Sequence, residues 1–179
     1  MAVEIRKIGT KSEIKRFIQF ANELYKDCPY YCPPLLFDEI NTFDRKKNPV
    51  MEFSDYQLFM AYRDGQAVGR IAALVNHKAN EAWGYKRVRF GWMDFIDDKE
   101  VSKALLDAVK QWGLERGMTE MNGPVGFTDW MVAMVGFSVI SCLCERCESL
   151  MVRMTTEARN RSIMPILVIL RVVAINVCR

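Results

Sequence analysis

The sequence predicts an α/β (α+β) fold in which a mixed, largely antiparallel sheet is flanked by helices. Three observations support this fold class. Apolar and polar residues alternate as in half-buried strands, two segments have the apolar spacing of amphipathic helices, and an Asp-Gly dipeptide joins two apolar runs. The predicted order is strand, helix, loop, hairpin, strand, helix and strand, which requires a sheet with helices packed on it.

The first strand and the first helix are predicted from alternation and capping. Residues 3–8 alternate between apolar and polar side chains. Thr10 and Glu13 then form a T-x-x-E capping box, which satisfies free backbone N–H groups at the start of a helix. Apolar side chains recur on one face of this helix over residues 14–25, and prolines follow soon after it. Residues 30–50 are predicted to be an ordered loop or a short helix.

A hairpin and a third strand follow in the predicted sheet. Residues 57–63 and 67–75 are the two strands of the hairpin, and Asp64-Gly65 between them favours a two-residue turn. Residues 88–96 are rich in aromatic and β-branched side chains and form the next strand, after a turn-like stretch at 76–86.

The second helix and the last strand come directly afterwards. The helix begins at a D-x-x-E cap that runs from Asp97 to Glu100. Its apolar stripe covers residues 101–112, and we expect it to end near Gly117. Residues 118–122 form a further short strand.

The composition is that of a globular protein. Half of the residues are hydrophobic and 26% are charged, which excludes collagen-like and strongly disordered chains. The length of 179 residues favours a single hydrophobic core. Residues 131–179 hold six Arg and three Glu, so the first 130 residues carry 19 basic and 19 acidic side chains. This balance predicts no nucleic-acid partner.

Cellular location and membrane association are predicted from apolar runs. The N-terminus has no continuous apolar region and no small-residue cleavage site, so we expect no secretory signal and a cytoplasmic location. The longest late apolar run, residues 163–177, contains Pro165 and Arg171 and is shorter than the roughly 20 residues that a membrane helix needs. We therefore expect no membrane partner.

The composition changes abruptly after Trp130. Residues 131–179 contain no Lys, Asp, Tyr or Trp, yet hold four of the six Cys and five of the eleven Met. We divide the chain into a domain at 1–130 and an atypical tail at 131–179. The tail either supplies late strands, at residues 163–170 and 172–177, or results from a gene truncation or a shifted reading frame. If its apolar residues are exposed, we expect self-association into a homo-oligomer.

Three segments carry a resemblance to a known family. They read GWMDFIDD at 91–98, EVSKAL at 100–105 and NGPVGFTD at 122–129. This pattern resembles bacterial proteins of the GNAT superfamily, which are acyl-CoA N-acyltransferase-like, and the resemblance covers residues 1–129. It implies a GNAT-like fold with an atypical or incomplete C-terminal third. It also implies transfer of an acetyl or other acyl group from acyl-CoA to a small-molecule amine. The alternative is a catalytically inactive GNAT-fold interaction module.

The resemblance also implies where acyl-CoA binds. In this superfamily, the strand before the central helix holds the pantetheine arm through its backbone, and the start of the helix receives the pyrophosphate. The corresponding positions here are Met93, Phe95, Ile96, Lys99, Ser102 and Lys103. The turn between them, at 97–100, has three carboxylates and no glycine, so ordinary helix capping is the alternative interpretation.

Asp94 is the candidate catalytic base, on the condition that its side chain faces the substrate. The alternative is a hydrogen-bonded structural residue, which is the more common role of an Asp near a strand end. No tyrosine follows Tyr85, so the sequence after the last predicted strand offers no tyrosine as the general acid that many members of the superfamily use.

Other candidate sites have simpler interpretations. His77 is the single histidine, so no Ser-His-Asp triad can form, and a solvated turn is its expected place. Three cysteines lie at 142–147, but only the distant Cys178 could complete a zinc site, and we expect no metal. Arg87 and Arg89 lie among aromatic residues. We interpret them as the outer face of a strand, directed to water or to an acidic ligand, rather than as a nucleic-acid site.

Overall fold

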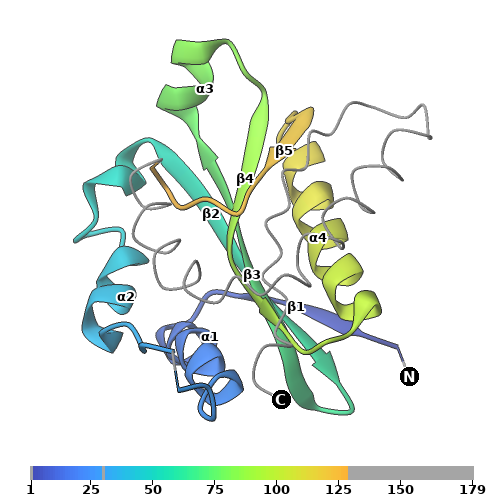
Figure 1. The fold of residues 1–179 in the computed structure, drawn as a ribbon. Helices are drawn as coiled ribbons and strands as arrows, with labels where there is room; N and C mark the ends of the chain where they lie inside the picture. The colour runs from blue at the N-terminus through green and yellow to red at the C-terminus, as the bar shows by residue number, and fades with distance from the viewer. Residues whose placement is uncertain (1, 30, 129–179) are drawn as a thin grey trace.

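The computed structural model describes residues 2–29 and 31–128 and contains one five-stranded sheet. The strands lie in the order in which they occur along the chain (Figure 1). Every neighbouring pair is antiparallel except the last, in which β4 and β5 are parallel. The strands are β1 (Glu4–Ile8), β2 (Ser54–Arg63), β3 (Gln66–Asn76), β4 (Arg87–Phe95) and β5 (Glu120–Asn122). The predicted fold class is confirmed.

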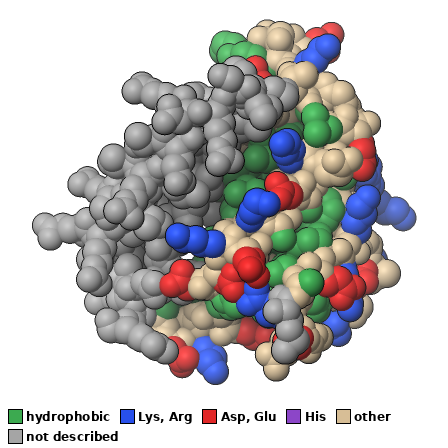
Figure 2. Space-filling view, turned by 90° about the vertical axis from the view of Figure 1, so that its right-hand side faces the viewer, with side chains coloured by type: hydrophobic (Ala, Val, Ile, Leu, Met, Phe, Trp, Pro, Cys, Tyr) green, Lys and Arg blue, Asp and Glu red, His purple; other side chains and the backbone are tan. Residues whose placement is uncertain are grey.

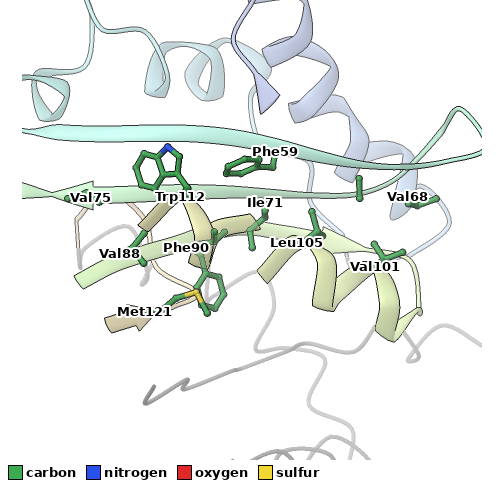
Figure 3. Close-up of a cluster of buried hydrophobic side chains, with 13 residues drawn as sticks. Phe59, Val68, Ile71, Val75, Val88, Phe90, Val101, Leu105, Trp112 and Met121 are labelled. Atoms are coloured by element: carbon green, nitrogen blue, oxygen red, sulfur yellow. The ribbon is translucent and has the colours of Figure 1, made fainter. Parts of the chain in front are cut away.

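Helices cover both faces of the sheet. They are α1 (Lys11–Leu24), α2 (Leu36–Thr42), α3 (His77–Trp83) and α4 (Lys99–Leu114), with a short 3₁₀ helix at Pro49–Glu52. Because successive strand residues point to opposite faces, β2 and β3 contribute to two separate cores. One core lies against α4 and includes Phe59, Ile71 and Leu105 (Figure 3). The other lies against α1 and α2 and includes Phe17 and Leu58.

Local sequence signals explain the first elements. Thr10 accepts from the backbone N–H of Glu13, and the Glu13 carboxylate accepts from the backbone N–H of Thr10, so the capping box is present. The positive φ angles of Asp64 (52°) and Gly65 (79°) are those that a tight two-residue hairpin turn requires. The hairpin between β2 and β3 is therefore confirmed.

Two predictions about helices were wrong. The stretch at 76–86 is not merely a turn, because α3 forms there with Asn76 as its N-cap and ends at Gly84, whose φ of 66° lies in the left-handed region. The cap of α4 is Asp98 rather than Asp97: its Oδ1 accepts from the backbone N–H of Glu100 at 2.8 Å. Within the described ranges, no helix combines the length and apolarity needed to cross a bilayer.

Of the two directions expected for Arg89, toward water or toward an acidic ligand, the first was wrong. Arg89 is buried, whereas Arg87 is partly exposed and binds the Glu120 carboxylate at 2.8 Å. Figure 2 shows the side of the molecule on which α4 lies, and over the described part of this view acidic and basic side chains are interspersed with hydrophobic ones. The late strands and the self-association predicted for 131–179 lie outside the described residues.

Candidate functional site

The edge of β4 that faces β5 is only partly paired. The two strands are paired over three residues of β4, Arg87–Arg89, and the last pair is Arg89 with Asn122. The backbone N–H of Val125 then donates to the carbonyl of Phe90 at 2.8 Å. Among the described residues, β5 pairs with none of residues 91–95. Within the described part of the chain, the backbone of β4 is therefore open on this side, next to the point where the two strands separate.

A β-bulge in β4 lies at the same point. Arg70 pairs with Asp94 and Ala72 pairs with Gly91, so β4 has one residue more than β3 between these pairs. Trp92, in the bulge, has a φ of 46°, which is an uncommon conformation for a bulky residue. Bulges and strained residues of this kind redirect side chains and occur often next to functional sites. The bulge therefore marks this stretch of β4 as a candidate site.

The chain after β5 crosses the edge of β4 to reach the face covered by α1 and α2. A Cβ atom at Gly91 would lie 2.5 Å from the carbonyl oxygen of Val125, so the close crossing requires glycine there. Phe127 then enters the core at 1% exposure, and its ring contacts the rings of Trp92 and Phe43. The crossing segment thus builds an aromatic wall beside the bulge.

Asp94 lies on this same face, in a network of buried polar groups. Its Oδ2 accepts from Nε and Nη2 of Arg70 at 2.8 and 2.7 Å, and its Oδ1 accepts from the Tyr25 hydroxyl at 2.9 Å. The Arg70 guanidinium also donates to the carbonyl of Phe17 in α1 at 2.8 Å. Burial raises the pKa of Tyr25, and the Asp94 carboxylate raises it further, so the hydroxyl keeps its proton.

A second carboxylate approaches the same region from α2. Glu39 accepts from the indole N–H of Trp92 at 2.8 Å. Tyr31 stacks near Tyr25 with 5.0 Å between ring centroids. Burial raises the pKa of Tyr31, and the Arg70 charge partly opposes this shift. The Asp94 and Glu39 carboxylates raise the pKa further, so both acids lie near this phenol. We call the set Tyr25, Tyr31, Glu39, Trp92 and Asp94 the acceptor face.

The predicted acyl-CoA positions lie on the other side of β4. Met93, Phe95 and Ile96 are partly buried against the core under α4, so the alternation along β4 separates their side chains from that of Asp94. The backbone N–H of Ile96 donates to the carbonyl of Val68 at 3.0 Å. The backbone of these residues therefore connects the open edge of β4 with the start of α4.

The start of α4 carries its own anionic cap. Asp98 accepts from the first backbone N–H groups of the helix and binds Nη1 of Arg63 at 2.6 Å. The Arg63 guanidinium, together with these backbone donors, lowers the pKa of Asp98. Lys99, Ser102 and Lys103 lie in the first turns, where Ser102 donates to the carbonyl of Lys99 at 3.1 Å and Lys103 pairs with Asp107 at 3.4 Å.

The sequence did not predict several residues of the acceptor face, nor the Arg70 side chain that binds Asp94. Arg70 carried a usable signal, because it is a single charged residue within an otherwise apolar strand. Tyr25 was assigned only to an apolar helix face, and Glu39 lay in a stretch predicted as a loop or a short helix. Neither position has a local pattern that pairs it with Asp94 or Trp92.

Two curated proteins are similar in sequence, and no family model matches the chain. Protein YghO of Escherichia coli K12 is 37% identical over 120 residues, which is 67% of this chain and 30% of that protein. The bacterial ceramide synthase of Caulobacter vibrioides is 32% identical over 118 residues, 65% of this chain and 31% of that protein. The chain thus spans about a third of the length of either relative.

Solved acetyltransferases share the architecture. A tandem GNAT protein from the clavulanic acid biosynthesis pathway superposes with a TM-score of 0.52 at 14% identity, over 75% of this chain and 43% of that chain. The enzyme AAC(6')-Iy, in complex with a CoA-containing bisubstrate analogue, superposes with a TM-score of 0.50 at 18% identity, over 77% of this chain and 89% of that one. At these identities the likeness is one of fold.

Proposed function

Because this chain has the fold of the GNAT acetyltransferases, we propose that it transfers an acyl group from acyl-CoA to a primary amine. The observation that carries the proposal is the open edge of β4 beside the bulge, with the acceptor face on one side and the start of α4 on the other. This arrangement offers separate approaches to the acyl donor and to the amine.

The donor is proposed to lie along the open edge of β4. Backbone groups of residues 93–96 would hold the pantetheine arm. The Ile96 N–H already donates to Val68, so an N–H of residues 93–95 would polarise the thioester carbonyl. Asp98 already accepts from the first N–H groups of α4, so those donors are taken. We therefore assign the donor phosphates to the side chains of Lys99 and Lys103, both exposed, with the Arg63 charge offsetting the acidic cap.

The amine is proposed to bind at the acceptor face. An amine is a cation at neutral pH, and the Asp94 and Glu39 carboxylates supply the complementary charge next to aromatic rings. Asp94 takes a proton from the ammonium group, and the free amine attacks the thioester carbon. The C–N bond forms and the C–S bond breaks. The proton that the attacking nitrogen loses as it becomes the amide passes to the sulfur, so CoA leaves as the thiol.

An acceptor with a long apolar chain is favoured by a relative. One protein similar to this chain is named a ceramide synthase, and a ceramide is the amide of a fatty acid and a long-chain amine. The rings of Trp92 and Tyr56 are only partly buried, pack on the buried rings of Phe43 and Phe127, and provide apolar surface in the region of Glu39. We therefore propose a long-chain amine as the substrate class.

The experiment measures binding and transfer in the full chain. Calorimetry with acetyl-CoA and with a long-chain acyl-CoA tests donor binding, and amide formation on sphinganine tests transfer. Asp94→Asn is expected to lower kcat by roughly 100-fold or more, the usual contribution of a general base. Glu120→Gln, on β5, removes the carboxylate that pairs with Arg87 of β4 and serves as the matched control, with activity unchanged.

Two results would reject this proposal. If neither acyl-CoA binds at millimolar concentration, the enzymatic function fails and the catalytically inactive interaction module remains. If Asp94→Asn binds acyl-CoA and retains full kcat, Asp94 is not the base and has only the structural role that its contacts with Arg70 and Tyr25 describe.

A further inference from the structure

The outer side of α2 and the turn after it expose apolar and basic side chains together. Leu35 is 72% exposed and Phe37 is 68% exposed, which is unusual for side chains of this size. Three consecutive cations, Arg45, Lys46 and Lys47, are exposed in the turn that follows the helix. The ammonium group of Lys47 lies 5.0 Å from the centre of the Phe37 ring, so the two groups share one surface. We call these five residues the α2 rim.

The opposite side of the same helix belongs to the core and to the acceptor face. Leu36 and Ile40 pack against the core under α1 and α2, and Glu39 binds the Trp92 indole. A single short helix therefore connects the acceptor face with the α2 rim. Whatever binds the α2 rim lies next to the site at which the amine is proposed to react.

The charges of the α2 rim are those that an anionic surface would bind. Of the acidic side chains close to it in the chain, Glu39 is turned to Trp92 and Asp44 accepts from the backbone N–H of Lys46. Asp38, which is exposed, is the acid that lies on the same outward stretch of α2. Apolar tips next to Lys and Arg are typical of protein surfaces that insert at the boundary between lipid headgroups and acyl chains.

We propose that the α2 rim binds the surface of an anionic lipid bilayer. This differs from the sequence-based expectation of no membrane partner, which considered only segments long enough to span a bilayer. Leu35 and Phe37 enter the headgroup region, and the three cations contact lipid phosphates. This placement holds the acceptor face against the layer in which a long-chain amine dissolves. The presentation of the acceptor face to a long-chain amine rests on the proposed function, whereas the binding of the α2 rim to lipid does not. A folded protein partner would need about 20 to 30 residues on each side, many more than the α2 rim provides.

Vesicle co-sedimentation of the full chain tests this proposal without any substrate. We expect binding to phosphatidylcholine vesicles to rise when phosphatidylglycerol is included, and to fall as salt is added. The double variant Leu35→Ser/Phe37→Ser is expected to weaken binding about tenfold or more, because two apolar side chains no longer enter the lipid. Lys46→Glu/Lys47→Glu is expected to abolish the preference for phosphatidylglycerol.

Trp83→Ser is the matched control, because Trp83 is 71% exposed on α3 and lies outside the α2 rim. It is expected to change vesicle binding less than twofold. The proposal is overturned if the Leu35→Ser/Phe37→Ser variant binds as the unsubstituted chain does, or if Trp83→Ser weakens binding equally. Absence of vesicle binding would likewise overturn it. A chain that binds vesicles but forms no amide would reject the proposed function alone.

Discussion

Breaking the buried ion pair between Arg70 and Asp94 is expected to destabilise the fold strongly. The two side chains are only 7% and 17% exposed, and their shortest contact is 2.7 Å. Removing one partner of a buried pair leaves an uncompensated charge and typically costs about 3 to 5 kcal/mol. Asp94→Asn keeps one oxygen that can accept from Arg70, and its NH2 group can donate to the Tyr25 hydroxyl, so we expect a loss near the lower limit, about 3 kcal/mol.

The double variant tests whether the loss comes from the charge. Arg70→Met also loses the hydrogen bonds to the carbonyls of α1, so we expect a cost of at least about 3 kcal/mol. With both charges removed, Arg70→Met/Asp94→Asn is expected to lose about 2 kcal/mol less than the two single losses combined, because neither charge remains unpaired. Urea denaturation of the unsubstituted protein, the two single variants and the double variant, followed by circular dichroism, measures these free energies of unfolding.

The pair between Arg87 and Glu120 is the matched control. Its side chains are 26% and 42% exposed, and partly solvated pairs contribute no more than about 1 kcal/mol. Glu120→Gln should therefore change the free energy of unfolding far less than Asp94→Asn does. Equal losses in the two variants, or an additive double variant, would contradict the argument that burial of Asp94 and Arg70 makes this pair costly to break.

Two further predictions concern the crossing segment and the start of α4. Phe127→Ala should lower the free energy of unfolding, measured in urea, by about 3 to 5 kcal/mol, because it empties a buried aromatic site. Trp83→Ala, at an exposed position, should change it by about 0.5 kcal/mol or less. Similar losses in the two variants would show that Phe127 does not anchor the chain after β5. The pKa of Asp98 is lowered in the folded protein, mainly by its hydrogen bond with Arg63. Ionised Asp98 therefore stabilises the fold at pH values above its ordinary pKa of 3.8, and this stabilisation is lost as the pH falls through the lowered pKa. Asp98→Asn should therefore show a smaller fall in Tm between about pH 6 and about pH 3, and an unchanged fall would contradict this role.

Local features of this protein were well determined by the sequence. The capping box at Thr10 and Glu13 and the turn at Asp64-Gly65 each involve residues close together in the chain, so their physical chemistry does not depend on the rest of the fold. The predicted cap of α4 was wrong by one residue, because two adjacent Asp residues can each cap a helix. The contact with Arg63, 35 residues earlier in the chain, favours the second of them, Asp98.

The resemblance to the GNAT superfamily predicted the fold and drew attention to Asp94, but not the surroundings of this residue. Its partner Tyr25 lies 69 positions away in the chain, and Arg70 lies 24 positions away. The assignment of Asp94 as a base therefore stays a prediction, and its placement beside two tyrosines and Glu39 makes it testable. The division of the chain at residue 130 also stays a prediction.

The sequence by itself determined the order and type of most elements of this protein, because hydrophobic periodicity and capping act over a few residues. Only the tertiary structure decided which side chains form the acceptor face. The bulge at Trp92 shifts the register of β4 by one residue, and in a strand each such shift reverses the face on which the following side chains lie. That reversal, together with the packing of α1 and α2, brings Asp94, Tyr25 and Glu39 into one region.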